Sequence, residues 1–232
     1  MPLPPSVPDW MRPEGLPAHR MPSAQALQRL IAGNGRRRRE RAGENLAPGD
    51  AVSAAFPFAL VVGCLEPGAA SEDLFAERPG AVECVRTAGP SLGSDTMAAI
   101  EYAALVQNVG IVLVLGHRNC AAVIAAREAR AAGRPSLPGA LGEWVPMAAA
   151  GSAALPATGG TASDSITGHV RALRAELRRA DSLLSLTRSG QLKIAGGVLD
   201  DDTGGIDFLP DEPDDVVEPV GLPRADRRQY GS

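Results

Sequence analysis

Three side chains that can bind a soft metal ion stand directly after two apolar segments. Cys64 directly follows the apolar residues 58–63. His117 directly follows the apolar residues 111–116, and Cys120 lies three positions further on. Two thiolates and one imidazole form a ligand set that zinc accepts, and such a set leaves the fourth position open for water or substrate, as in catalytic zinc sites. Thiolate is a soft ligand that favours zinc over magnesium or calcium. We therefore predict a Zn²⁺ site made of Cys64, His117 and Cys120.

The elements that carry these ligands are expected to be central strands. Both apolar runs are short, continuous, rich in β-branched residues and end in Gly, as is typical of buried parallel strands. Open α/β sheets place their chemistry just beyond the carboxyl ends of such strands, so the ligands could meet there. Residues 192–199 give a further core strand. The remaining periodic segments predict helices at residues 95–106, 121–132 and 169–186. A first helix is also predicted, which Ser23 could cap and whose apolar stripe is formed by Ala26, Leu27, Leu30 and Ile31. Residues 151–165 are expected to form a flexible loop. The predicted fold class is α/β, with a mostly parallel central sheet and helices on both sides.

The segments around the ligands resemble the β-class carbonic anhydrases, in the right order and over most of the chain. The resembling segments are residues 26–34 (ALQRLIAGN), 57–64 (PFALVVGC), 79–80 (PG), 85–89 (VRTAG), 100–103 (IEYA), 116–120 (GHRNC), 190–197 (GQLKIAGG) and 202–204 (DTG). The resemblance implies the β-carbonic-anhydrase fold with an N-terminal helical arm and one zinc per chain. It also implies a homodimer or higher homo-oligomer and a small-molecule substrate, carbon dioxide or bicarbonate.

One motif departs from this family. The family's first ligand lies in a Cys-x-Asp-x-Arg motif, whose Asp–Arg pair frees the fourth zinc position and helps to handle the proton. Here the motif reads Cys64-Leu65-Glu66-Pro67-Gly68, so the acid is one methylene longer and the Arg is missing. Glu66 is therefore the catalytic candidate. It could be the acid/base partner of a zinc-bound water, or a fourth ligand that closes the site, as the family's Asp does in its resting form. Either role is favoured over a side chain that points to solvent, and the sequence does not decide between them.

The predicted function is that of a zinc-dependent lyase or hydrolase that uses a zinc-bound water or hydroxide. Carbon dioxide hydration is expected to be weak, because the altered pair disturbs both the release of the fourth zinc position and proton handling. The missing Arg also opens volume beside the metal, so a divergent zinc enzyme acting on a larger substrate is an alternative. A second alternative is a catalytically inactive pseudoenzyme that keeps zinc for stability, assembly or bicarbonate sensing.

The composition excludes several other classes. The chain has 232 residues and a formal net charge of −4, which gives no general attraction to nucleic acid or to an anionic membrane. No apolar stretch approaches the ~20 residues that span a bilayer. The first residues lack the basic start and apolar run of a secretory signal, and two of the three Cys are assigned as ligands, so we expect a cytoplasmic protein without a disulfide framework. The basic cluster Arg36 to Arg39 is interpreted as a solvated helix end or a salt-bridged dimer arm.

The chain is expected to divide into a Pro-rich flexible arm (1–21), the zinc domain (22–210) and an acidic flexible tail (211–232). Four further features receive structural interpretations. Cys84 is expected to pack in the core, and Arg86 to be structural or interface-forming, with a contact to Glu66 as the lesser alternative. His169 is expected at the surface near a helix start. Asp200 to Asp202 are expected to form a solvated turn.

Overall fold

A computed structural model describes residues 7–17, 19–44, 54–66, 72–133, 138–149 and 162–211. Its centre is a five-stranded sheet in the order β2-β1-β3-β4-β5, in which the first four strands are parallel and β5 is antiparallel to β4. The strands are β1 (Ala59–Cys64), β2 (Val82–Thr87), β3 (Ile111–His117), β4 (Lys193–Leu199) and β5 (Ile206–Phe208). The predicted α/β class is confirmed.

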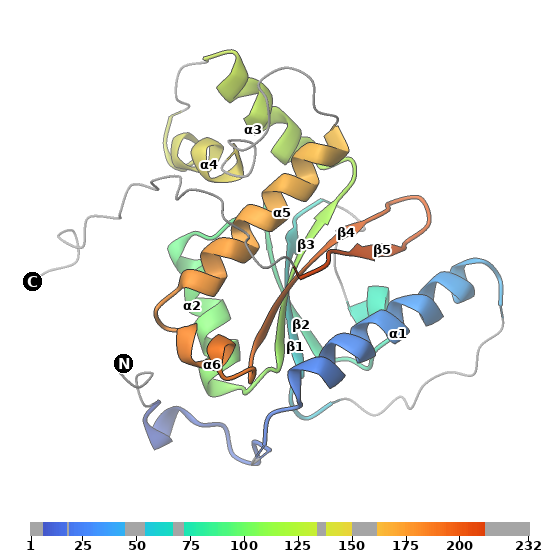
Figure 1. The fold of residues 1–232 in the computed structure, drawn as a ribbon, viewed down its shortest axis with the longest axis vertical. Helices are drawn as coiled ribbons and strands as arrows, with labels where there is room; N and C mark the ends of the chain where they lie inside the picture. Colours follow the sequence, from blue (N-terminus) through green and yellow to red (C-terminus); the bar gives the residue numbers. More distant parts are fainter. Residues whose placement is uncertain are drawn as a thin grey trace, which may run out of the picture.

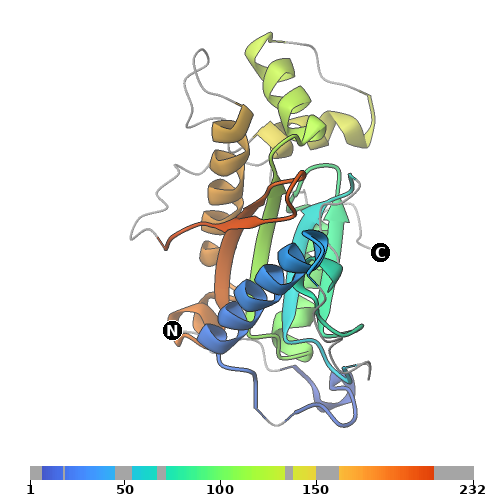
Figure 2. The same cartoon turned by 90° about the vertical axis from the view of Figure 1, so that its right-hand side faces the viewer.

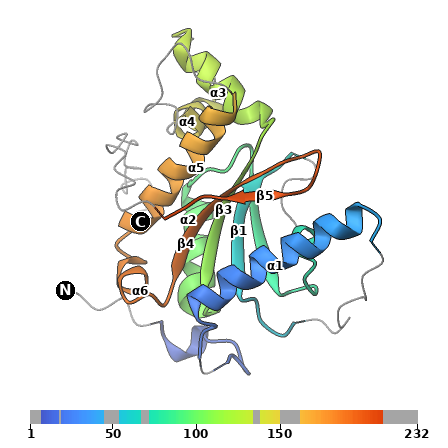
Figure 3. The same ribbon diagram turned by 45° about the vertical axis from the view of Figure 1, so that its right-hand side comes forward.

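Helices cover both faces of this sheet. The helix α1 (Ser23–Arg41) lies on one face, whereas α2 (Ser94–Glu101), α5 (Ala162–Arg179) and α6 (Leu184–Arg188) lie on the other (Figures 1 and 2). The helices α3 (Ala121–Ala131) and α4 (Ala140–Ala149) are stacked beyond the carboxyl ends of the strands (Figure 3). The short helices are η1 (Asp9–Met11), η2 (Glu72–Phe75) and the π-turn η3 (Tyr102–Val106), which continues α2. The carboxyl end of the sheet is therefore the end that faces α3 and α4.

The two ligand-bearing strands are neighbours in the sheet. In β1 and β3, Ala59 pairs with Ile111 and Val62 with Val114, and every residue of both strands is buried. Complete burial on both faces explains why these strands read as continuous apolar runs and not as alternating ones. The pairing brings the ends of β1 and β3 to the same edge of the sheet, as the sequence predicts.

The helix α1 is attached to the sheet by a face that differs from the predicted one. Its buried residues include Ala26 and Leu30, as expected, but also Gly33 and Asn34, whereas Ile31 is 37% exposed. A Cβ added at Gly33 would lie 2.0 Å from the carbonyl oxygen of Phe75, so this close approach requires glycine. The Ile31 prediction was wrong because the helix turns its smallest residues, and not its largest, toward η2.

Asn34 fixes the position of this helix. Its side-chain amide donates to the carbonyl oxygens of Leu74 (3.0 Å) and Gly204 (2.9 Å), and its oxygen accepts from the amide of Ile206 (3.0 Å). Asn34 is only 3% exposed, so all three bonds are buried or nearly so. A single polar side chain thus links α1 to η2 and to the start of β5.

Two helix predictions need correction. Ser23 begins α1 but does not cap it, because its hydroxyl donates to the carbonyl oxygen of Gly190. The predicted helix 169–186 begins earlier, at Ala162, and is divided by a turn after Arg179, so residues 184–188 form the separate α6. His169 therefore lies within α5, and the prediction that it is a surface residue was wrong: it is 0% exposed. Of the predicted loop 151–165, residues 162–165 are helical and 151–161 lie outside the described residues.

The predicted arm and tail are only partly within the described residues. Within the arm, residues 9–11 form η1, and the Arg20 guanidinium donates to the carbonyl oxygens of Ala104 (2.7 Å) and Val109. Residues 1–6 and 18, and residues 212–232 of the predicted tail, lie outside the described part of the chain, so these domain boundaries stay predictions. Among the described helices, none combines the length and apolar character needed to cross a membrane.

Candidate metal centre

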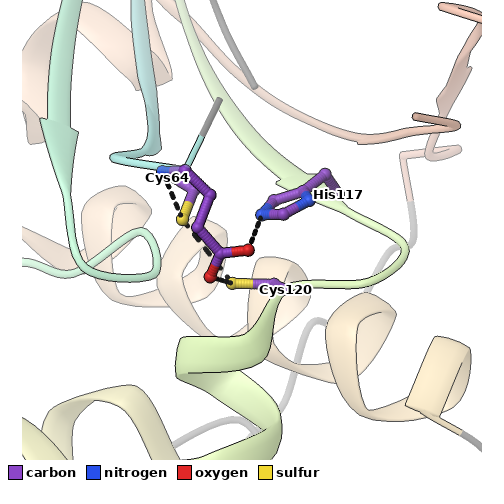
Figure 4. Close-up of side chains that lie close together, drawn as sticks. Cys64, His117 and Cys120 are labelled. Atoms are coloured by element: carbon purple, nitrogen blue, oxygen red, sulfur yellow. Dashed lines mark hydrogen bonds and ion pairs between the residues drawn. The ribbon is translucent and has the colours of Figure 1, made fainter. Parts of the chain in front are cut away.

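The three predicted ligands meet at the carboxyl edge of the sheet. Cys64 ends β1, His117 ends β3 and Cys120 precedes α3, and all three residues are buried. Their side chains point toward one another (Figure 4). The two sulfur atoms are 3.6 Å apart, and the ligand atoms of Cys64, His117, Cys120 and Glu66 all lie within 4.8 Å of one another. This spacing is compact enough for one metal ion to bind all four side chains.

The turn after β3 brings Cys120 back to His117. The amide of Cys120 donates to the carbonyl oxygen of His117 (3.2 Å), and the amide of Arg118 donates to that of Leu199 in β4 (3.0 Å). The strand end is also pressed against α5, since a Cβ added at Gly116 would lie 2.8 Å from side-chain carbons of both Ile166 and Val170. The position of His117 is therefore fixed by the sheet and by the helix that covers it.

The two nitrogen atoms of His117 have different surroundings. Nδ1 lies 3.2 Å from the Asp201 carboxylate, whereas Nε2 is buried without a hydrogen-bond partner and lies 3.6 Å from a Glu66 carboxylate oxygen. Buried polar atoms without partners are rare in proteins. Metal-ligating histidines usually donate their other ring nitrogen to a carboxylate or carbonyl oxygen. The donor set and the unpartnered Nε2 therefore fit a zinc ion.

Asp201 is a functional candidate that the sequence interpretation missed. The turn of Asp200 to Asp202 was expected to be solvated, and Asp202 is indeed exposed, but Asp201 is directed at His117. Asp200 has a structural role. Its carboxylate accepts hydrogen bonds from the backbone amides of Asp202 and Thr203 and forms an ion pair with Arg118 at 2.7 Å. The signal for Asp201 was its place just beyond β4, whose last residue, Leu199, pairs with His117.

Hydrogen bonds within the cluster shift the pKa values of the ligands. The hydrogen bond from Cys120 lowers the pKa of Cys64 to about 4 against the opposing effect of burial, with further help from His117 and from the amides of Glu66 and Gly89. The same bond to Cys64, together with burial, raises the pKa of the Cys120 thiol. Burial alone would lower the pKa of His117, but the nearby Cys64 thiolate and the Asp201 carboxylate outweigh it and raise the pKa to about 9.

These shifts fix the protonation of the metal-free cluster. Near pH 7, Cys64 is a thiolate, whereas Cys120 and His117 carry protons. Zinc binds thiolate and neutral imidazole, so its binding must displace these two groups' protons. Zinc affinity is therefore expected to fall as the pH falls.

The Glu66 side chain lies against the cluster rather than pointing away from it. Its carboxylate accepts from the amides of Ala121 (3.4 Å) and Ala122 (3.2 Å) at the start of α3, and it is 3.8 Å from the Cys120 sulfur. The amide of Glu66 donates to the Cys64 sulfur (3.4 Å). The roles of acid/base partner and fourth ligand both stay predictions. Pro67 and Gly68 lie outside the described residues.

Arg86 holds the loop that carries Cys64 and Glu66. Its guanidinium donates to three successive carbonyl oxygens, those of Cys64 (2.8 Å), Leu65 (3.0 Å) and Glu66 (2.8 Å). Hydrogen bonds from an ionised donor are shorter and stronger than neutral ones. The structural interpretation of Arg86 agrees with these contacts, and Arg86 meets Glu66 at its backbone carbonyl.

A second loop supports the Cys64 sulfur. The amide of Gly89 donates to this sulfur (3.4 Å), and Gly89 has a φ of +65° that favours glycine. His169 donates from Nε2 to the carbonyl oxygen of Pro90 (2.6 Å), so α5 holds the same loop from the other side. Burial lowers the pKa of His169, which keeps it neutral. Cys84 is half-buried against the core, in agreement with a packing role.

Replacing Asp201 by Asn is expected to weaken zinc binding by roughly 10–100-fold, the usual cost of losing a carboxylate that orients a ligating histidine. The measurement is a zinc competition titration against a chromogenic chelator. Asp202→Asn is the matched control, because Asp202 is the exposed neighbour and its replacement removes the same charge. Equal affinities for the two variants would show that Asp201 does not orient His117.

Comparison with known proteins agrees with this fold. A β-carbonic anhydrase from Coccomyxa matches 79% of this chain and 86% of its own chain, with a TM-score of 0.58 and 24% identity. The family model described as carbonic anhydrase matches residues 59–206, which include all four residues of the cluster. The chain belongs to the β-class carbonic anhydrase family. The resemblance inferred from the sequence is thereby confirmed.

Curated carbonic anhydrases match smaller shares of this chain than the Coccomyxa structure does. Carbonic anhydrase 2 of Mycobacterium tuberculosis is 42% identical over 73 residues, which are 32% of this chain and 35% of that protein. The match thus spans about a third of the length of this relative. A carbonic anhydrase of Pseudomonas aeruginosa is 30% identical over 161 residues, 66% of this chain and 73% of the relative.

Proposed function

We propose that this β-carbonic anhydrase family member is a zinc-dependent enzyme of the lyase or hydrolase type, with weak carbon dioxide hydration. The observation that carries the proposal is the cluster of four ligand atoms within 4.8 Å, in which the His117 Nε2 is buried without a hydrogen-bond partner. Cys64, His117 and Cys120 would hold the ion. A bound zinc ion would supply a Lewis acid that lowers the pKa of water at its open position.

The surrounding residues position these ligands. Asp201 orients the His117 ring and holds its Nδ1, so that Nε2 faces the thiols. Arg86 fixes the backbone of Cys64 and Glu66, and the amide of Gly89 supports the charge on the Cys64 sulfur. None of these three groups needs to touch a substrate. They set the geometry and the protonation of the site before substrate arrives.

We infer that Glu66 is the fourth donor in this conformation. One carboxylate oxygen lies 3.6 Å from the His117 Nε2, and the amides of Ala121 and Ala122 stabilise the negative charge at the start of α3. The sequence has Gly68 at the position of the family's Arg, so this position offers no cation that would draw the carboxylate away. Substrate would then enter only after Glu66 moves out, which would make turnover slow.

The test is a stopped-flow assay of carbon dioxide hydration on zinc-loaded protein near neutral pH. We expect a turnover number more than about tenfold below that of a family member with the intact Asp–Arg pair, since a positioned proton acceptor contributes ~10²–10⁴-fold in rate. The comparison enzyme is assayed in the same buffer at equal zinc occupancy. A turnover number within tenfold of the comparison enzyme would contradict the proposal of weak hydration.

The position of the Glu66 carboxylate beside the His117 Nε2 also favours a second candidate function, that of a zinc-binding pseudoenzyme. A carboxylate that stays bound as fourth ligand would leave no position for substrate, and the protein would keep zinc for stability, assembly or bicarbonate sensing. Complete absence of hydration by protein with full zinc occupancy would support this candidate. A divergent enzyme for a larger substrate is the third proposal, and hydrolysis of a bulkier ester by the same preparation would favour it.

We further propose a homodimer or higher homo-oligomer in the cytoplasm. Two β-carbonic anhydrases of Sordaria macrospora, one of which shares this fold with a TM-score of 0.54, are tetrameric. In this chain Trp10 is 83% exposed, as suits a residue covered by another subunit. All three cysteines are free, in keeping with a reducing compartment. A monomer mass in sedimentation experiments would contradict the assembly.

A further inference from the structure

A cavity at the amino end of the sheet is bordered by the last residues of the arm and by the start of α1. Its volume is about 400 Å³. Phe58 and Ala81 line it and lie directly before β1 and β2, whereas the metal-ligand candidate Cys64 ends β1. The arm and the start of α1 lie at this same end of the sheet (Figures 1 and 2). The cavity and the metal centre are therefore at opposite ends of the strands.

The lining of this cavity is both basic and apolar. It includes Arg20, Arg29 and Arg78, and its apolar part includes Phe56, Phe58 and three prolines. Among the described residues of the lining, none is acidic. The volume lies within the usual range for small-molecule sites, which combine apolar walls with a few charged or polar groups. This composition suits an anion that has an apolar body.

The charge of Arg20 is surrounded by neutral groups. Its guanidinium donates to the carbonyl oxygens of Val109 and Ala104 (2.7 Å) and to the Asn108 Oδ1 (3.4 Å), and it has no carboxylate partner within the described part of the chain. These three bonds leave two of the five donors of a guanidinium unused. Burial lowers the pKa of Arg20, the direction expected when no negative charge offsets the loss of hydration.

Arg78 adds a second positive charge without a partner. It is half-buried in the cavity wall, and its side chain forms no hydrogen bond or ion pair with any other residue that the structure describes. A charged side chain that is partly removed from water is stabilised by an ion of opposite sign. Arg20 and Arg78 thus give this cavity an excess of positive charge.

The third arginine has a different role, because Arg29 is already paired. It donates from Nε and Nη2 to the Glu77 carboxylate (2.9 and 2.6 Å), and its guanidinium lies 4.3 Å from the centre of the Phe58 ring. Glu77 also pairs with Arg36 (3.6 Å), so this carboxylate faces two cations and leaves the charges of Arg20 and Arg78 uncompensated. Arg29 instead holds the aromatic wall of the cavity in place.

We propose that this cavity binds a small aromatic carboxylate, whose acidic group contacts Arg20 and Arg78 and whose ring packs beside Phe56 and Phe58. Guanidinium groups match the planar geometry of a carboxylate and bind it through charge-assisted hydrogen bonds. Aromatic rings pack favourably against one another in addition to the apolar area that they bury. The ligand would supply the negative charge that the lining lacks. This site does not depend on the proposed function of the metal centre.

The test is isothermal titration calorimetry of the full chain with benzoate. We expect saturable binding, and we expect benzamide, which has the same shape without the charge, to bind at least about tenfold more weakly. Acetate, which lacks the ring, should also bind more weakly. Arg78→Gln should weaken benzoate binding about tenfold, because it removes a charge-assisted contact. Arg78→Lys, which keeps the charge but loses the planar fork, should fall between Arg78→Gln and the unchanged protein.

His19→Glu is a second variant that does not rely on Arg78. His19 is an exposed residue of the lining, so we expect its replacement to leave the fold intact. A carboxylate at this position should repel benzoate and weaken its binding about tenfold. Arg39→Gln is the matched control, because Arg39 is an exposed arginine on the same helix as Arg29 and does not line the cavity. This control should bind benzoate as the unchanged protein does.

A spectroscopic measurement separates this cavity from the metal centre, since carboxylates also bind metal ions. The visible absorption of cobalt-substituted protein should stay unchanged when benzoate saturates the cavity. Four results would overturn the proposal: no binding at millimolar benzoate, unchanged affinity in both Arg78→Gln and His19→Glu, equal loss in Arg39→Gln, or a cobalt spectrum that changes with the affinity measured by calorimetry. If the protein takes up no metal, the proposed function fails, and the calorimetric comparison of the variants still decides this proposal.

Discussion

Replacing Cys64 or Cys120 by Ser is expected to remove zinc from the purified protein. Each thiolate is one of three proposed ligands, and a neutral hydroxyl is a poor zinc ligand. The zinc content measured by mass spectrometry should therefore fall from about one per chain to near zero, and any zinc-dependent activity should be lost with it.

Cys84→Ser is the control for these two variants. Cys84 is the third free cysteine and lies in β2, outside the four-residue cluster, so its replacement should leave the zinc content unchanged. Circular dichroism before metal analysis would separate loss of zinc from loss of fold. Full zinc retention by both Cys64→Ser and Cys120→Ser would show that the zinc ion is bound at another site.

Replacing Glu66 by Ala is expected to open the fourth metal position. The carboxylate is held beside the His117 Nε2 by the amides that begin α3, so as a tethered ligand it competes at an effective concentration of millimolar or more. Removing it should strengthen the binding of azide to cobalt-substituted protein by about tenfold or more. The measurement is a titration followed by the visible absorption of cobalt.

Glu66→Gln is the control that keeps the size of the side chain and removes its charge. Its azide affinity should fall between those of the unchanged protein and Glu66→Ala. If Glu66 acts only as an acid/base partner, azide affinity would stay constant in both variants while the hydration rate fell by ~10²–10⁴-fold. The two roles that the sequence leaves open therefore predict different azide titrations.

The parts of the fold that the sequence predicts well are those set by local pattern. Residues 59–64 and 111–117 read as continuous apolar runs because both faces of these strands are buried. The meeting of Cys64 with His117 and Cys120 follows from a general property of parallel sheets, whose carboxyl ends share one edge. These features need no knowledge of distant partners.

The parts that sequence interpretation misses depend on contacts between distant residues. His169 looks like a surface residue beside Thr167 and Gly168, yet its burial depends on Pro90, which is 79 positions away. Arg86 reaches a loop 20 to 22 positions earlier, and Asp201 lies 84 positions after His117. The start of α5 was missed because residues 162–165 (ASDS) show no apolar periodicity, whereas Ser165 is buried and accepts a hydrogen bond from Arg127, 38 positions earlier.

The bonds of Asn34 limit how subunits of this protein can exchange segments. If α1 left its own sheet to join a partner subunit, two carbonyl groups and one amide, those of Leu74, Gly204 and Ile206, would lose their bonds to Asn34. Each such loss costs about 1–3 kcal/mol when the group stays buried. The tie of Arg20 to Ala104 extends this constraint to the residues just before α1. These bonds disfavour any one-sided transfer of α1, so an arm that reaches over a partner without a reciprocal exchange of α1 would begin before Arg20.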